Sequence, residues 1–158
     1  MGPQGILRQI IDHGDVQKLP SMILWGPSGV GKTTLARVIA HKLNAKFVEL
    51  SAPSASANEV KKLIQDARKE WQLLHRRTIL FLDEIHRFTR TQQDSLLAGV
   101  EKGDIVLIGA TTENPSFKLT GALLSRTRVF VLQPLTKQEL ETVIKRAGPD
   151  TNPQIIEM

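Results

Sequence analysis

Short runs of aliphatic and β-branched residues alternate along the chain with longer segments in which apolar residues recur at helical spacing. The apolar runs lie at 21–25, 46–50, 78–82, 105–109 and 129–132. Their nearly continuous apolar character is typical of strands that are covered on both faces, as in parallel sheets. Strands that alternate with helices predict an α/β domain with a mainly parallel sheet of five strands.

The most regular helical pattern covers residues 59–74. Its apolar positions are Val60, Leu63, Ile64, Ala67, Trp71 and Leu74. Either Ser56 together with Glu59, or Asn58 alone, is expected to cap the start of this helix. A second capping pattern begins at Thr136 and predicts a helix to about Arg146, after the last strand.

The segment that follows the first predicted strand matches the phosphate-binding pattern G-x-x-x-x-G-K-[ST], known as the P-loop or Walker A motif. Glycines let backbone N–H groups turn toward phosphate oxygens, and the following helix adds unpaired donors and its dipole. Lys32 is expected to reach the β- and γ-phosphates, and the Thr33 hydroxyl to ligate Mg²⁺. The expected nucleotide-binding residues are Pro27, Ser28, Gly29, Val30, Gly31, Lys32, Thr33 and Thr34.

The third predicted strand delivers two carboxylates, Asp83 and Glu84, at its carboxyl end. Ligands of open α/β sheets bind outside that end. Asp83 is expected to hold Mg²⁺ as a hard oxygen ligand, and Glu84 to polarise the attacking water. Taken alone, such a pair also fits a helix cap, but it follows a P-loop in the same small domain. The pair therefore predicts a nucleotide hydrolase.

Two further positions have candidate roles in hydrolysis. After the fourth predicted strand, Thr112 is the first candidate for a sensor of the γ-phosphate or the water, and Asn114 the second. Arg126, before the last strand, is the best candidate for a cation that stabilises transition-state charge on a neighbouring subunit's ATP. The alternatives remain open at this stage: a polar turn after the strand, and a surface arginine at a helix C-terminus.

Composition changes this picture little. The chain has 158 residues, a formal charge of +5 and no cysteine, which excludes disulfides and thiolate metal sites within it. No apolar run approaches the roughly 18 residues of a membrane span, so we expect no membrane partner. The basic balance favours an anionic partner, either nucleotide, nucleic acid or both, although solvated helix faces explain the short basic clusters equally well.

Taken together, the motifs resemble the clamp-loader branch of the AAA+ ATPases. The stretches at 21–27, 83–88, 91–94 and 108–117 resemble one family more closely. It comprises bacterial replication-associated recombination protein A, the yeast maintenance-of-genome-stability protein and the animal Werner-helicase-interacting ATPase. The resemblance implies a P-loop three-layer αβα sandwich over residues 1–134, followed at 135–158 by the start of a truncated helical lid.

The family also implies ATP and Mg²⁺ as ligands, and DNA (forked, gapped or single-stranded) and replication and repair proteins as partners. It implies a homo-oligomer in which Arg126 acts in trans, because Ser125-Arg126-Thr127 resembles the clamp-loader Ser-Arg-Cys box. The location implied is the nucleus, or the cytoplasm for a bacterial source. Gly2, Pro3 and Gln4 resemble the segment that lines the adenine pocket. Ser51 departs from the pattern, since many AAA+ proteins have an asparagine there that restrains the catalytic glutamate.

Other functions share some of these motifs. A clamp-loader subunit or a branch-migration motor would keep the same core, but the long match at 108–117 argues against both. A nucleotide-gated scaffold with little turnover would not need Glu84 or Arg126. A P-loop kinase would need a lid rich in arginines and no glutamate beside Asp83. We expect both chain ends to be cut from a longer protein that carries the lid and oligomerisation domains.

Overall fold

The computed structural model describes residues 19–133 and 154–157. These residues form a six-stranded sheet in the order β2-β3-β4-β1-β5-β6. The strands are β1 (Met22–Trp25), β2 (Lys46–Ser51), β3 (Thr78–Asp83), β4 (Val106–Thr111), β5 (Arg128–Gln133) and β6 (Gln154–Glu157). The first five are mutually parallel, and β6 pairs antiparallel with β5 at the edge. The predicted parallel sheet is therefore confirmed, with one additional strand.

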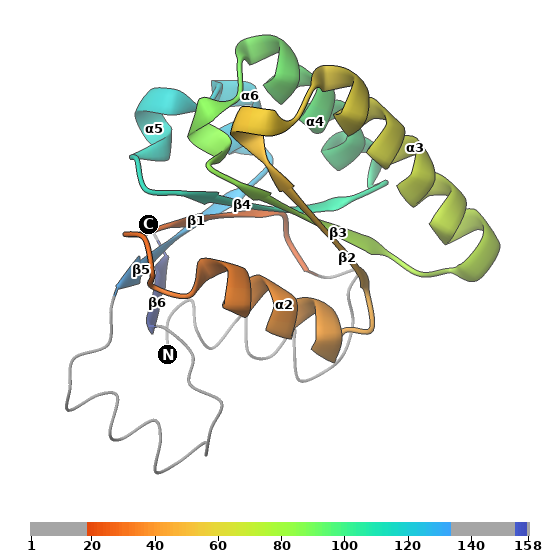
Figure 1. The fold of residues 1–158 in the computed structure, drawn as a ribbon, viewed down its shortest axis with the longest axis horizontal. Coiled ribbons are helices and arrows are strands. Elements are labelled where there is room, and N and C mark those ends of the chain that lie inside the picture. Colours follow the sequence, from red (N-terminus) through yellow and green to blue (C-terminus); the bar gives the residue numbers. More distant parts are fainter. Residues whose placement is uncertain (1–18, 134–153, 158) are drawn as a thin grey trace.

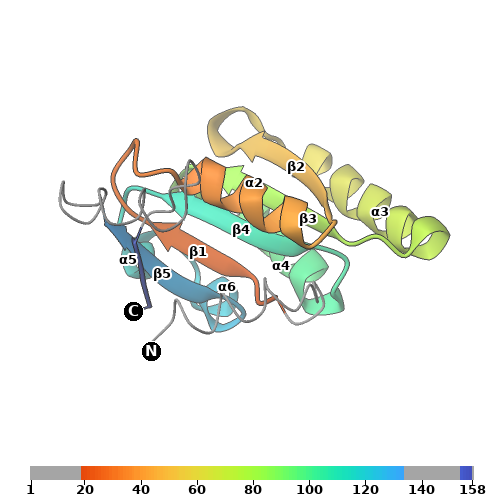
Figure 2. The same ribbon diagram turned by 90° about the horizontal axis from the view of Figure 1, so that it is seen from below.

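Helices cover both faces of the sheet and complete three layers (Figure 1). Helix α2 (Lys32–Lys42) lies along one face, where it crosses over the central strands (Figure 2). The opposite face carries α3 (Ala57–Leu74), α4 (Arg90–Lys102), α5 (Pro115–Lys118) and α6 (Gly121–Ser125). Two 3₁₀ turns, η2 (Ala52–Ser54) and η3 (Ile85–Arg87), follow β2 and β3 on this side.

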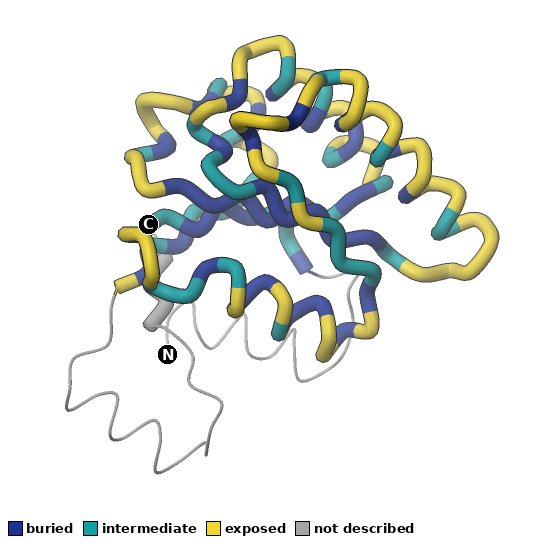
Figure 3. The backbone as a smooth tube through the Cα atoms, viewed as in Figure 1, coloured by how far each residue is buried: buried dark blue, intermediate teal, exposed yellow. Residues whose placement is uncertain are grey.

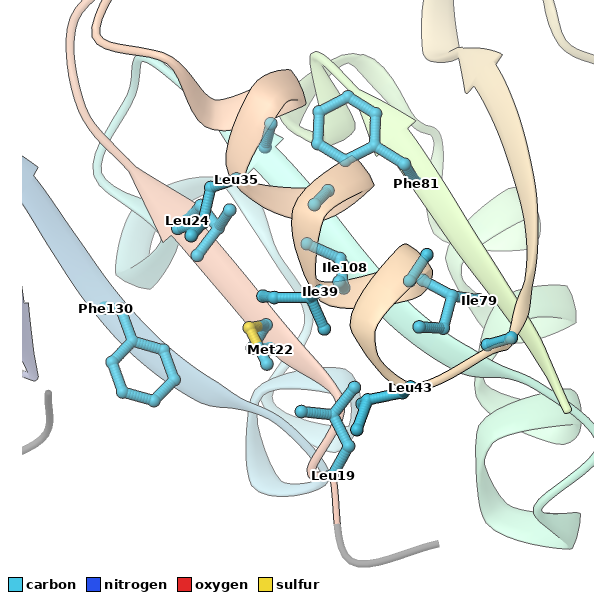
Figure 4. Close-up of a cluster of buried hydrophobic side chains, with 14 of the residues drawn as sticks. Leu19, Met22, Leu24, Leu35, Ile39, Leu43, Ile79, Phe81, Ile108 and Phe130 are labelled. Carbon is cyan, nitrogen blue, oxygen red and sulfur yellow. The ribbon is translucent and has the colours of Figure 1, made fainter. Parts of the chain in front are cut away.

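Two hydrophobic clusters hold the layers together, one on each face of the sheet. On the α2 side, Leu35 and Ile39 pack onto the β1 residues Met22 and Leu24 (Figure 4). The second cluster lies beneath α3 and α4 and includes the fully buried Leu96 of α4. The central strands β1, β3 and β4 are dark along most of their length in Figure 3, which agrees with the coverage of both faces that their apolar runs predicted, whereas β2 is only partly covered.

Local capping explains where the two long helices of this face begin. The Ser56 hydroxyl accepts a hydrogen bond from Glu59 N at 3.1 Å, so Ser56 rather than Asn58 caps α3. Thr89 and Gln92 form a reciprocal capping box at the start of α4. These caps set where α3 and α4 begin, a few residues after β2 and β3 end.

The chain after β5 differs from expectation where it is described. Residues 154–157 form β6, a strand, although the sequence predicted the start of a helical lid for 135–158. The helix predicted between Thr136 and about Arg146 lies outside the described residues, and the boundary at 134 stays a prediction. β4 extends to Thr111, two residues beyond the predicted strand end, and this brings Thr111 into the sheet beside β1.

Candidate functional site

The loop between β1 and α2 leaves the sheet at the carboxyl ends of the parallel strands (Figure 2). Gly29 and Gly31 have φ angles of 81° and 97°, in the left-handed region that side chains rarely adopt. Gly31 is also the N-cap residue of α2, so the unpaired N–H groups of the first helical turn follow directly. A loop with this backbone can direct several N–H donors at one anion, as phosphate binding requires.

The start of this loop is held against both neighbouring strands. Gly26 N donates to Thr111 O of β4 at 3.0 Å. On the other side, a Cβ atom added to Gly26 would lie 2.6 Å from the backbone oxygen of Leu132 in β5. Backbone cannot retreat as a flexible side chain can, so only glycine fits between the two strands. The phosphate-binding loop is therefore anchored to the centre of the sheet.

Lys32, the lysine of the motif, is buried at the beginning of α2. Its ammonium group donates hydrogen bonds to the carbonyl oxygens of Gly26 and Pro27, the second at 3.2 Å. Burial lowers the pKa of Lys32, and the nearby negative charge of Asp83 opposes that shift. The structure thus brings the start of α2 and the end of β3, and with them Lys32 and Asp83, close enough for their charges to interact.

The two carboxylates diverge at the end of β3. Asp83 is the last strand residue, lies opposite Ser51 of β2, and accepts a hydrogen bond from Glu84 N at 3.0 Å. Glu84 has a φ angle of 54°, an uncommon value for a residue with a side chain. This backbone conformation turns the chain away from the strand direction immediately after Asp83. The Asp83 carboxylate is therefore held by a backbone N–H group, while Glu84 lies at the point where the chain turns away from the strand.

The turn after Glu84 is anchored by a packing contact with β4. Ile85 is fully buried, and a Cβ atom added to Gly109 would lie 2.7 Å from its Cδ1 atom. The same added atom would lie 2.9 Å from Cδ1 of Ile23 in β1. Gly109 therefore leaves the notch into which Ile85 fits. Because Ile85 follows Glu84 directly, this notch also sets the position of the carboxylate.

We predict that Gly109→Ala destabilises the fold by about 1–3 kcal/mol, because a methyl group there overpacks the core. The variant should also slow any nucleotide hydrolysis, since Ile85 cannot move without shifting Glu84. Chemical denaturation and a nucleotide turnover assay measure the two effects. Gly121→Ala is the matched control, because a Cβ at Gly121 meets nothing within 4 Å. Equal stability of the two variants would contradict the packing account.

The two sensor candidates have different environments. Asn114 caps the short helix α5, where its Oδ1 atom accepts from Ser116 N at 3.0 Å. Thr112 is exposed immediately beyond the carboxyl end of β4, beside the Gly26 loop that contacts the same strand. The preceding Thr111 is buried, and its hydroxyl group lies 2.9 Å from His86 Nδ1. Neither Thr111 nor His86 was among the residues predicted from the sequence, which favoured Thr112 and then Asn114.

Arg126 lies at the other end of the parallel strands, where their amino termini are. It is the C-cap residue of α6, two residues before β5, whose Arg128 pairs in register with the first residue of β1. The four residues of β1 alone span about 13 Å at about 3.3 Å per residue. The side chain is 57% exposed and its Nε atom lies 3.6 Å from Glu101 Oε1. The structure therefore does not bring Arg126 to the loop and carboxylates of its own chain.

Arg126 and Glu101 also border a shallow depression at this amino edge, with a volume of about 320 Å³. Its lining residues are Leu19, Ser21, Arg77, Val100, Glu101, Gly103, Ile105, Val106 and Arg126. Arg77 is fixed there by its hydrogen bond to Gly103 O at 2.6 Å and by its position over the Trp71 ring. Arg126 is thus exposed beside side chains that are held by their own contacts, and a second molecule can reach it.

The donor set at the carboxyl edge fits Mg²⁺ better than a metal that needs nitrogen or sulfur ligands. Thr33, in the first turn of α2, and Asp83 offer hard oxygen atoms. Within the described part of the chain, no group of three or more histidine or acidic side chains could hold a metal by itself. Mg²⁺ commonly combines one or two protein oxygens with phosphate and water ligands, which is what these two residues can provide.

Some sequence expectations fall outside what the structure describes. Gly2, Pro3 and Gln4, the predicted lining of the adenine pocket, lie outside the described residues. Among the helices that are described, none has the length and apolar character needed to cross a membrane.

Comparisons with a family model and with individual relatives point to the same family of proteins. Residues 22–135 match the model of the ATPase family associated with various cellular activities, AAA. Replication-associated recombination protein A of Haemophilus influenzae is 49% identical over 91% of this chain, and that of Escherichia coli is 52% identical over 84%. ATPase WRNIP1 of Dictyostelium discoideum is 55% identical over 82% of the chain.

Among solved structures, the Thermotoga maritima RuvB Holliday junction branch migration motor matches with a TM-score of 0.68 and 33% identity. That match covers 91% of this chain and 47% of the RuvB chain. The chain spans only 31%, 29% and 15% of the Haemophilus, Escherichia and Dictyostelium relatives. The three-layer fold, the phosphate-binding loop and the paired carboxylates agree with these matches. The chain belongs to the AAA family of ATPases and, within it, to the group of replication-associated recombination protein A and ATPase WRNIP1.

Proposed function

We propose that this chain is the Mg-ATP-hydrolysing core of a DNA-dependent homo-oligomeric motor that acts at stalled or gapped replication forks. One observation carries the proposal. Lys32, Asp83 and Glu84 lie at the carboxyl edge of the sheet, whereas the exposed Arg126 lies at the amino edge. A site that needs all four residues is complete only where two copies meet, as in a head-to-tail ring or filament.

In the proposed reaction the loop residues 27–34 surround the phosphates of ATP. Lys32 exchanges its bonds to Gly26 O and Pro27 O for bonds to phosphate oxygens. Thr33 and Asp83 would hold Mg²⁺, which would neutralise part of the phosphate charge when bound. Glu84 orients and polarises the attacking water, and Thr112, with Asn114 as the second candidate, contacts the γ-phosphate or that water.

The neighbouring subunit completes the site in this proposal. Its copy of Arg126 faces the γ-phosphate and stabilises the charge that develops in the transition state. The surface ion pair with Glu101 is weak enough to be exchanged, because both side chains are about half exposed. Gly2, Pro3 and Gln4 would border the adenine base of the bound nucleotide.

The role in replication and repair is supported by the names of the relatives, which include replication-associated recombination proteins. Forked, gapped or single-stranded DNA is the proposed activator, and replication and repair proteins are the proposed partners. The net charge of +5 suits an anionic polymer. The proposed location is the nucleus, or the cytoplasm if the source is bacterial.

A second candidate is a branch-migration motor, because the chain superposes on RuvB with a TM-score of 0.68. The two candidates differ in the DNA that stimulates hydrolysis. ATP turnover by the full-length protein is therefore measured without DNA, with forked or gapped DNA and with a four-way junction. We expect forked or gapped DNA to stimulate most strongly. Stronger stimulation by the four-way junction favours branch migration, and equally slow turnover in every case favours a nucleotide-gated scaffold.

A further inference from the structure

A partly buried hydrogen bond joins the turn after Glu84 to the end of β4. His86 Nδ1 lies 2.9 Å from Thr111 Oγ1, and Thr111 is 1% exposed. The proposed reaction assigns neither residue a role. The bond links two segments that are 25 residues apart in the chain and that each carry a proposed participant in hydrolysis.

The Thr111 hydroxyl group makes two further bonds, and all three are satisfied together in only one direction of the bond to His86. It accepts from Glu113 N at 2.9 Å and lies 3.0 Å from Glu113 O, to which it can only donate. A hydroxyl group has one proton and two lone pairs. Once its proton is given to Glu113 O, the bond to His86 requires that Nδ1–H donates. All three bonds are then satisfied, and the imidazole orientation is fixed.

Thr111 also contacts the phosphate-binding loop through its backbone. Its carbonyl oxygen accepts from Gly26 N at 3.0 Å, while its side chain bonds to His86. Thr112 follows it directly in sequence, and Glu84 lies two residues before His86. One buried threonine therefore connects the loop that receives phosphate, the turn that carries the carboxylate, and the strand end that carries the sensor candidate.

We propose that His86 and Thr111 are positioning residues that hold Glu84 and Thr112 in register with the phosphate-binding loop during ATP hydrolysis. The inference rests on the proposed ATPase function and adds two residues to it. Neither residue belongs to the phosphate-binding loop or to the proposed Mg²⁺ ligands. Their loss therefore slows the chemical step more than it weakens nucleotide binding. A displacement of about 1 Å in such an arrangement costs up to about 10²-fold in rate.

Two amide variants of His86 distinguish the loss of the hydrogen-bond donor at the Nδ1 position from the loss of the imidazole ring. In His86→Asn the amide nitrogen can occupy the Nδ1 position and still donate to Thr111. In His86→Gln the amide lies one bond farther out, near the Nε2 position, and this donor is lost. We expect His86→Gln to reduce the single-turnover rate by about 10–100-fold. We expect His86→Asn to stay within about 3-fold of wild type, and the ATP Kd of both to change by less than about 2-fold.

The same comparison applies to the partner. Thr111→Val keeps the volume and removes the hydroxyl group, whereas Thr111→Ser keeps the hydroxyl group. Valine should slow the reaction at least as much as His86→Gln, because it also removes the two bonds to Glu113, and serine should restore most of the rate. Because the bond between the two side chains is already lost in either single variant, the double variant His86→Gln/Thr111→Val should be no slower than the slower single variant. Thermal unfolding of each variant confirms that the compared proteins are folded.

The experiment uses the full-length protein, a fluorescent ATP analogue for Kd, and Glu84→Gln as a reference. A wild-type rate in His86→Gln beside an inactive Glu84→Gln overturns only the positioning role. Additive losses in the double variant, or a loss of ATP binding equal to the loss of rate, overturn it as well. A wild-type rate in Glu84→Gln overturns the proposed ATPase mechanism itself.

Discussion

Glu84→Gln is expected to bind ATP as tightly as the wild type and to hydrolyse it roughly 10²–10⁴-fold more slowly, the usual contribution of a general base. Glutamine has the same shape as glutamate, so the left-handed turn at this position and the burial of Ile85 are kept. Lys32, Thr33 and Asp83 remain in place to hold the nucleotide. Only the group that polarises water is lost, and ATP is trapped in the site.

The measurement combines ATP affinity with the rate of phosphate release at saturating ATP. Asp94→Asn is the matched control, because it removes one carboxylate charge from the exposed side of α4, which starts soon after the same turn. The control should retain the wild-type rate. If Glu84→Gln turns over as fast as this control, Glu84 is not the group that activates water.

Arg126→Ala should spare ATP binding and lower oligomer-dependent hydrolysis by roughly 10³–10⁵-fold, the range found for arginines supplied in trans to phosphoryl-transfer sites. Binding is spared because Arg126 lies at the edge of the sheet remote from its own phosphate-binding loop. The fold should be little affected. The ion pair with Glu101 is exposed, and such pairs contribute about 0–1 kcal/mol.

The test follows hydrolysis over a range of protein concentrations. The wild type should gain specific activity as it assembles, and Arg126→Ala should not. Arg37→Ala is the matched control, since it also removes an exposed arginine from a surface ion pair, the one with Glu49 at 2.8 Å. Equal specific activity of wild type and Arg126→Ala at every concentration would refute the role in trans.

Much of the site follows from local sequence. The phosphate-binding loop and the Asp83-Glu84 pair are contiguous motifs directly after apolar strands, so their place at one sheet edge could be predicted. The parallel order also explains why Arg126, before β5, lies at the other edge. By contrast, β6 has four residues, of which only two are apolar, so the sequence does not mark it as a strand. Its pairing with β5 is seen only in the structure.

The supports of the site could not be predicted, because they depend on contacts between distant segments. In the sequence, Gly109 is only a small residue within an apolar strand. The structure shows that Ile85 packs against the space that its missing side chain leaves. Likewise, the Thr111 hydroxyl group looks like a surface polar group until β4 is found to extend to it and bury it. The sequence therefore predicts which groups meet the nucleotide, and the structure adds the contacts that hold the segments carrying them.

The most direct test of the central claim mixes the two inactive variants of the full-length protein. A Glu84→Gln subunit retains Arg126, and an Arg126→Ala subunit retains Glu84, so one interface in about four of an equal random mixture has a complete site. If the site is shared between copies, the mixture should regain up to about a quarter of wild-type ATP hydrolysis, although neither variant is active alone. A mixture that stays as inactive as its components, under conditions in which mixed oligomers form, would contradict a catalytic site built from two copies of this chain.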